Sequence, residues 1–117
     1  MRREFCEHLI DQLSTWAIVA VKSMFGGFGV YRAGQIFGIV DEDSLYFKVD
    51  DTNRPDYEAV GSEPFTYEAR GKRNSLGYWL VPSDIMDKPD ELSSWAEKAY
   101  QVGLRATKNK PKKKPKR

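Results

Sequence analysis

The sequence has only one cysteine, Cys6, and one histidine, His8. A single cysteine cannot close an internal disulfide, which fits a reducing compartment such as the cytoplasm. Residues two positions apart on a helix point to different faces, so a Cys6–His8 nucleophile pair is disfavoured. A metal site would need further cysteine or histidine ligands, or clustered carboxylates. We therefore expect no catalytic residue, no metal and no cofactor, and a protein that is not an enzyme.

The sequence also lacks a long hydrophobic run. The apolar stretch at residues 16–21 is far shorter than the roughly 20 residues that span a bilayer. The first residues, Met1 to Glu4, lead into an amphipathic pattern that contains acids, which is unlike a signal peptide. We expect a cytoplasmic protein that does not associate with a membrane.

The two charge signs are unevenly distributed. Seven of the 19 basic residues lie in residues 108–117, where there is no acid. Residues 1–107 therefore carry 12 basic and 17 acidic residues, a net charge of −5 against +2 for the whole chain. The sequence predicts one domain over residues 1–107 and a disordered, Lys/Pro-rich basic tail over residues 108–117.

Hydrophobic periodicity predicts an α+β fold. Apolar residues recur at helical spacing in the first segment and in the last, and they alternate in the segments between. Phe28, Val30, Ile36 and Val40 share one parity, as on one face of a strand pair. The expected order is a helix from about residue 5 to residues 14–17, strands over 19–32, 35–40 and 44–49, a short helix capped by Thr52 or Asn53, strands over 65–68 and 76–81, and a helix over 89–105. We expect two layers, with an antiparallel sheet of about five to six strands and the helices packed on one side.

A glycine-rich run stands at Gly26-Gly27-Phe28-Gly29. It lacks the Gly-Lys-Ser/Thr end of a phosphate loop, and no third glycine opens a helix as in dinucleotide-binding motifs. The favoured interpretation is a strand with a bulge, a bend or a close backbone approach to a packing helix, and a small-molecule ligand is the alternative.

Two charged turns each permit a ligand-binding and a solvent-exposed interpretation. Asp41-Glu42-Asp43 begins like a calcium loop, but Tyr46 stands where that loop needs glycine, so a solvated hairpin turn is favoured. The second turn carries Arg70, Lys72 and Arg73, with Tyr67, Tyr78 and Trp79 nearby. It could contact a phosphate backbone and stack a base, or it could be a solvated turn.

The basic tail is the strongest functional signal. Its cations, spaced by proline, would bind DNA or RNA without sequence specificity, and the alternative is a tail that only adds solubility. The candidate nucleic-acid-binding residues are Lys108, Lys110, Lys112, Lys113, Lys114, Lys116 and Arg117.

Several runs in the sequence resemble the N-terminal domain of the TfoX/Sxy competence regulators. They are residues 24–31, 45–50, 53–57, 64–67 and 78–82, and the resemblance covers roughly residues 5–105. The candidate motif residues, structural or ligand-binding, are Met24, Phe25, Gly26, Gly27, Gly29, Tyr31, Lys48, Asn53, Arg54 and Pro55.

The resemblance implies a two-layer α+β fold with no known catalytic residue or cofactor. It implies a bacterial, non-enzymatic accessory regulator of competence and transcription that works with a transcription-regulator protein. Full-length members carry a second, helical domain, whereas here residues 108–117 follow. We expect the tail to supply the nucleic-acid contact. The alternatives are a general nucleic-acid-associated protein and a small-molecule-binding domain at the glycine-rich strand. A dimer is possible, and nothing in the sequence requires one.

Overall fold

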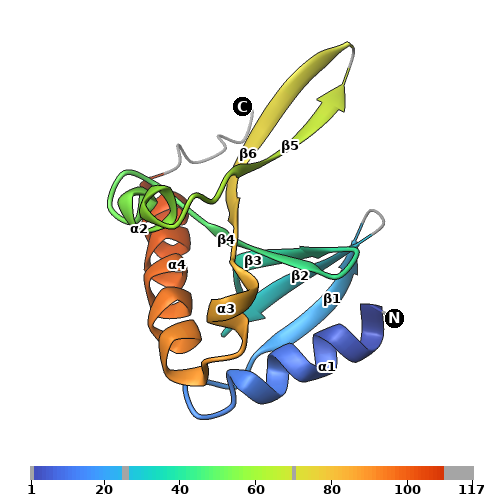
Figure 1. Cartoon of the computed structure of the whole chain (residues 1–117), viewed down its shortest axis with the longest axis vertical. Helices are drawn as coiled ribbons and strands as arrows, with labels where there is room; N and C mark the ends of the chain where they lie inside the picture. Colours follow the sequence, from blue (N-terminus) through green and yellow to red (C-terminus); the bar gives the residue numbers. More distant parts are fainter. Residues whose placement is uncertain (1, 25–26, 70, 110–117) are drawn as a thin grey trace, which may run out of the picture.

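The chain builds a six-stranded sheet and four helices (Figure 1). The computed structural model describes residues 2–24, 27–69 and 71–109. The elements are α1 (Arg2–Gln12), β1 (Ala20–Met24), β2 (Gly27–Arg32), β3 (Gln35–Asp41), β4 (Ser44–Lys48), α2 (Arg54–Ala59), β5 (Pro64–Ala69), β6 (Lys72–Leu80), α3 (Ser83–Met86) and α4 (Pro89–Asn109).

The sheet is antiparallel throughout, in the strand order β1-β2-β3-β4-β6-β5. The turns at Ala33-Gly34 and at residues 41–43 are short, which permits the expected meander of β1 to β4. Positive φ angles at Ala33, Gly34 and Glu42 let these turns reverse the chain tightly. The predicted α+β class, the strand number and the order of the main elements are confirmed.

One face of the sheet forms the core with the helices. Opposed residues in antiparallel strands share a face, and one such row crosses Val30, Gly38, Phe47 and Trp79. Val30 and Phe47 are fully buried, as are Leu9 of α1 and Leu13, which follows this helix. Helix α1 ends at Gln12, before the predicted end near residues 14–17. The apolar stripe predicted for the last helix faces the core. Four of its members are buried, Leu92, Ala96, Ala99 and Val102, and the fifth, Trp95, is partly buried against the core.

A β-bulge changes the face of one predicted core residue. Val30 pairs with Gly38 and Tyr31 with Ile36, so Phe37 is the extra residue of β3. Phe37 is fully buried and stacks edge-on against Trp16 and Tyr100. The Ile36 side chain lies beside Gly29 and Tyr31, on the opposite face. The prediction that Ile36 shares a face with Val30 is wrong, because the extra residue shifts the alternation.

Helix α4 packs closely on the sheet through Gly103. A Cβ atom there would lie 2.7 Å from the carbonyl oxygen of Ile36, so glycine is needed for this approach. The helix continues to Asn109, four residues beyond its predicted end at Arg105. Lys108, expected to begin the extended tail, is therefore an exposed helical residue.

Strands β5 and β6 extend beyond the body as a projecting ribbon (Figure 1). Only residues 78–80 of β6 pair with β4, whereas β5 pairs with β6 alone. We call β5 together with residues 72–77 of β6 the arm. The arm projects on the side towards which α4 runs, so the end of α4 that carries Lys108 lies towards the arm (Figure 1).

Candidate functional site

The predicted basic residues fall into two regions. Lys72 is exposed on the arm, and Arg73 pairs with Glu68 across the ribbon in backbone register. Arg70 lies outside the described residues. Lys108 is exposed on the last turn of α4. The other candidate tail residues also lie outside the described residues: Lys110, Lys112, Lys113, Lys114, Lys116 and Arg117.

Tyr78 and Trp79, two of the three aromatic residues predicted beside the basic turn, do not present their rings on one surface. Trp79 faces the helices and contacts Tyr57 of α2, with ring centroids 6.3 Å apart. Tyr78 lies on the opposite face and is only 7% exposed. Adjacent strand residues point to opposite faces, so the pair cannot form a single stacking platform.

Two glycines of the predicted motif lie in β2, where each makes room for protein atoms. A Cβ atom at Gly27 would collide with the backbone carbonyl oxygen of Val40. A Cβ atom at Gly29 would lie 2.9 Å from both Met24 Sδ and Tyr31 Cε1. The close approach at Gly27 is to the backbone of β3, a neighbouring strand, and not to a packing helix as the sequence predicted. Phe25 and Gly26 lie outside the described residues.

The second face of the sheet carries several of the remaining motif residues. No helix within the described ranges packs over it (Figure 1), and none of its side chains belongs to the core cluster. Strand register places on this face the residues Lys22, Met24, Gly29, Tyr31, Ile36, Ile39, Tyr46, Lys48 and Tyr78. We call this surface the open face.

Two lysines stand over two tyrosine rings on the open face. Lys22 Nζ lies 5.0 Å from the centre of the Tyr31 ring, and Lys48 Nζ lies 4.8 Å from that of Tyr78. Such a cation on a ring face is favourable by about 0.5–1 kcal/mol at exposed sites. Burial raises the pKa of Tyr78 to about 12, with the Tyr31 phenol as a second cause. The Tyr78 hydroxyl is therefore neutral at physiological pH.

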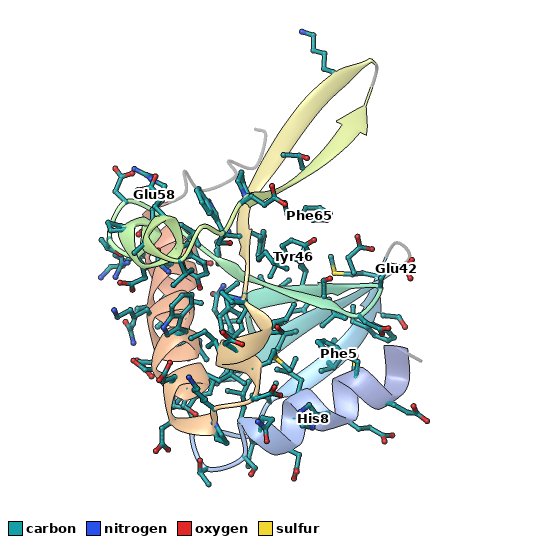
Figure 2. All side chains as sticks on the ribbon, in the orientation of Figure 1. Phe5, His8, Glu42, Tyr46, Glu58 and Phe65 are labelled. Atoms are coloured by element: carbon teal, nitrogen blue, oxygen red, sulfur yellow. The ribbon has the colours of Figure 1, made fainter. Side chains whose placement is uncertain are left out.

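Tyr46 extends the aromatic surface towards the arm. Its ring meets that of Phe65 edge to face, with centroids 4.9 Å apart, and Figure 2 shows the two residues beside each other near the base of the arm. Burial raises the pKa of Tyr46, and the nearby Asp41 and Glu63 carboxylates raise it further.

Sequence reasoning did not single out Lys22 or Tyr46. The available signal was the period of two along a strand. Lys22 and Met24 flank Ser23, and Tyr46 and Lys48 flank Phe47, so each flanking pair shares a face. Alternation shows which residues share a face, but it does not show which face the helices leave uncovered.

The motif residues at the start of α2 are structural. Asn53 is 1% exposed. Its Oδ1 accepts a hydrogen bond from the Asp50 N–H at 2.9 Å, and its Nδ2 donates to the Lys48 carbonyl at 3.1 Å. Asn53 stands at the N-cap position without capping the helix through its side chain, so the predicted side-chain cap is wrong there. Thr52 bonds Asp50 and Arg105 instead.

The next two motif residues also serve the helix start. Arg54 forms ion pairs with Asp51 at 2.7 Å and Glu58 at 3.7 Å. Pro55 lies in the first turn, where its missing N–H costs no helical hydrogen bond.

A polar cluster joins three parts of the chain on the helix side. Glu97 Oε1 of α4 accepts a hydrogen bond from Trp16 Nε1 at 2.9 Å and one from Arg32 at 3.3 Å. The Arg32 guanidinium lies 4.6 Å from the Trp16 ring centre and 4.8 Å from that of Tyr100. Hydrogen bonds from Gln101 and Trp16 lower the pKa of Glu97. Every member has a partner within the fold, so the cluster serves to hold α4 on the sheet.

The titratable side chains of α1 do not converge. Cys6 is buried at 5% exposure, whereas His8 is exposed, so the two point to different sides of the helix as predicted. Figure 2 shows His8 on α1, far from Tyr46 and Phe65. Among the described residues, no group of three or more His, Cys, Asp or Glu side chains could hold a metal ion. No helix in the described ranges is long and apolar enough to cross a membrane.

Comparison with known proteins supports the resemblance found in the sequence. A comparison with curated proteins gives no match. Residues 11–103 match the family model of the TfoX N-terminal domain, from the end of α1 to Gly103 of α4. This match covers well over half of the 117 residues and includes the whole sheet. The chain therefore belongs to the TfoX N-terminal domain family, which is related to competence for DNA uptake.

Proposed function

We propose that this chain is a non-enzymatic accessory regulator of competence and transcription. In this proposal the folded domain acts through contacts with a transcription-regulator protein, and the basic residues attract DNA or RNA. Membership of the TfoX N-terminal domain family supports the link to competence. The regulatory role is drawn from the family by analogy.

The observation that carries the nucleic-acid part is the separation of charge. Residues 1–107 have a net charge of −5, whereas residues 108–117 contain seven cations, of which Lys108 lies in the last turn of α4. An acidic body repels nucleic acid, so attraction must come from a local basic segment. Lys72, exposed on the arm and followed in the sequence by Arg73, is the candidate for a second, smaller basic contact.

Titration of a fluorescent DNA duplex at several salt concentrations tests the role of the tail. A full-length variant has all seven basic residues of 108–117 changed to glutamine, and we call it the tail-neutral chain. The matched control keeps the tail composition in shuffled order. The natural and shuffled chains should bind equally, with log K falling linearly with log salt. The tail-neutral chain should lose this binding, and binding retained by it would contradict the role of the tail.

Transformation assays test the regulatory part. Cells that lack the gene should take up and express marker DNA less often, and the full chain should restore this. The Lys72→Gln/Arg73→Gln variant tests whether the basic residues of the arm contribute to transformation. Unchanged transformation after gene deletion would overturn the proposed link to competence.

A general nucleic-acid-associated protein is the second candidate, and the same charge separation supports it. It predicts that a peptide of residues 108–117 binds as tightly as the full chain. Ligand binding at the glycine-rich strand gains no support, because protein atoms fill the space beside Gly27 and Gly29.

A further inference from the structure

The open face carries aromatic rings and cations on the sheet surface that the helices leave uncovered. Tyr31 and Tyr46 are each half-buried, and their rings stand on neighbouring parts of the sheet. Lys22 is exposed above Tyr31, and Lys48 lies above Tyr78. Rings on a sheet surface with lysines beside them match the two needs of a single strand, which are stacking surfaces for bases and cations for phosphates.

The distribution of charge around Lys22 and Tyr31 favours the same ligand. Across β1 to β4, the only acid in register with the open face is Asp41, at the end of β3, and with Glu63 it lies near Tyr46. The other acids of these four strands and their turns are Glu42 and Asp43, which lie in the β3–β4 turn. A body with a net charge of −5 thus presents two lysines on its uncovered sheet surface.

Gly29 fixes the position of the first ring. Because this residue has no side chain, the Tyr31 ring and Met24 Sδ occupy the space above its Cα atom. Ile36 Cδ1 fills the same space from β3. The Tyr31 ring therefore lies close to the backbone at Gly29, and Lys22 Nζ stands over the ring. A ring held this way loses little freedom when a base stacks on it.

We propose that the open face binds single-stranded nucleic acid, with bases stacking on Tyr31 and Tyr46 and with Lys22 and Lys48 contacting phosphates. On binding, the ammonium of Lys22 leaves the ring face to a base and moves to the adjoining phosphate. Duplex DNA does not satisfy this surface, because its bases are already stacked and paired. The tail supplies attraction over distance, and the open face adds short-range contacts that distinguish single strands from duplexes.

Fluorescence anisotropy of a labelled, single-stranded oligonucleotide of fifteen thymidines tests the proposed binding directly. The protein is the tail-neutral chain, so the basic tail contributes nothing. We expect saturable binding that is weaker for the duplex of the same length. Tyr31→Leu and Tyr46→Leu keep apolar bulk without a ring, and each should weaken binding about fivefold or more. Thermal unfolding checks that each variant is folded.

A charge-matched pair of double variants controls for electrostatics. Lys22→Gln/Lys48→Gln removes two cations from the open face, and Lys88→Gln/Lys98→Gln removes two from the helix side. The first pair should lower the slope of log K against log salt by about 1 to 1.5. The second pair should leave the slope nearly unchanged.

Three outcomes would overturn the inference. The tail-neutral chain could fail to bind the oligonucleotide, or both lysine pairs could weaken binding equally. Alternatively, sedimentation could show a dimer that the Tyr31 and Tyr46 variants dissociate, which would assign the open face to a second copy of the chain. Each outcome is independent of duplex binding by the natural tail, so it leaves the proposed function to its own test.

Discussion

At the scale of single residues, Asn53 shows how a buried amide can hold a loop. Its side chain bonds the Asp50 N–H and the Lys48 carbonyl, and thereby joins the end of β4 to the start of α2. Asn53→Ala leaves both backbone groups without this partner. We expect a loss of about 1–3 kcal/mol in the free energy of unfolding, measured by urea denaturation. Ser94→Ala on the exposed side of α4 is the control and should change it by less than about 0.5 kcal/mol.

The two glycines of β2 differ in what surrounds them. At Gly27 a Cβ atom would meet the backbone of Val40, which cannot move without disturbing the β2–β3 pairing. At Gly29 it would meet the flexible ends of Met24, Tyr31 and Ile36. Overpacking costs about 1–3 kcal/mol, and we expect Gly27→Ala near the upper limit and Gly29→Ala near the lower. The reverse order in urea denaturation would contradict the assignment of Gly27 to a backbone contact.

At the scale of elements, Glu97 links α4 to the β2–β3 hairpin and to the segment after α1. Hydrogen bonds lower its pKa in the folded chain. Its contribution to stability is therefore present above its unfolded pKa of about 4.3 and is lost as pH falls through the lower folded value. The side chain is 45% exposed, so Glu97→Gln should cost only about 0.5–1 kcal/mol at pH 7. That difference should shrink below about pH 4 in denaturation curves, and a constant difference would exclude the carboxylate as its source.

The sequence predicted which helices and strands form better than it predicted their ends and the faces of single residues. The α+β class and the order of helices and strands were predicted from two patterns. These were the apolar stripes of α1 and α4 and the alternation of apolar residues in β3 and β4. The bulge at Phe37 could not be predicted, because both Ile36 and Phe37 are apolar and only strand pairing decides which one enters the core. The end of α4 was placed too early, because contacts such as Thr107–Gln35 at 3.0 Å hold its last turns. Which face of the sheet stays uncovered depends on the side on which α1 and α4 pack. A single sequence does not reveal that side.

At the scale of the whole molecule, the fold should become unstable in alkali. The pKa of Tyr78 rises from 10.0 in the unfolded chain to about 12. The folded chain therefore favours the neutral phenol. This stability is complete below about pH 10 and is lost as pH rises through 12. Tyr78→Phe should lose less stability over this range than the natural chain. An equal loss in both chains, measured by denaturation at pH 9 to 12, would show that other groups cause it.

The end of α4 is fastened to the body at two places. Thr107 bonds Gln35 of β3, and Arg105 bonds Asp50 and Thr52 before α2. Counted from the end of α4 at Asn109, a fully extended segment of eight residues, 110–117, spans at most about 26–29 Å. If the proposed role of the tail holds, a polyanion bound by its cations would be confined near the domain at a high effective concentration. Even a weak contact made by the folded domain would then be occupied much of the time, so the tail and the domain would act as a bivalent binder.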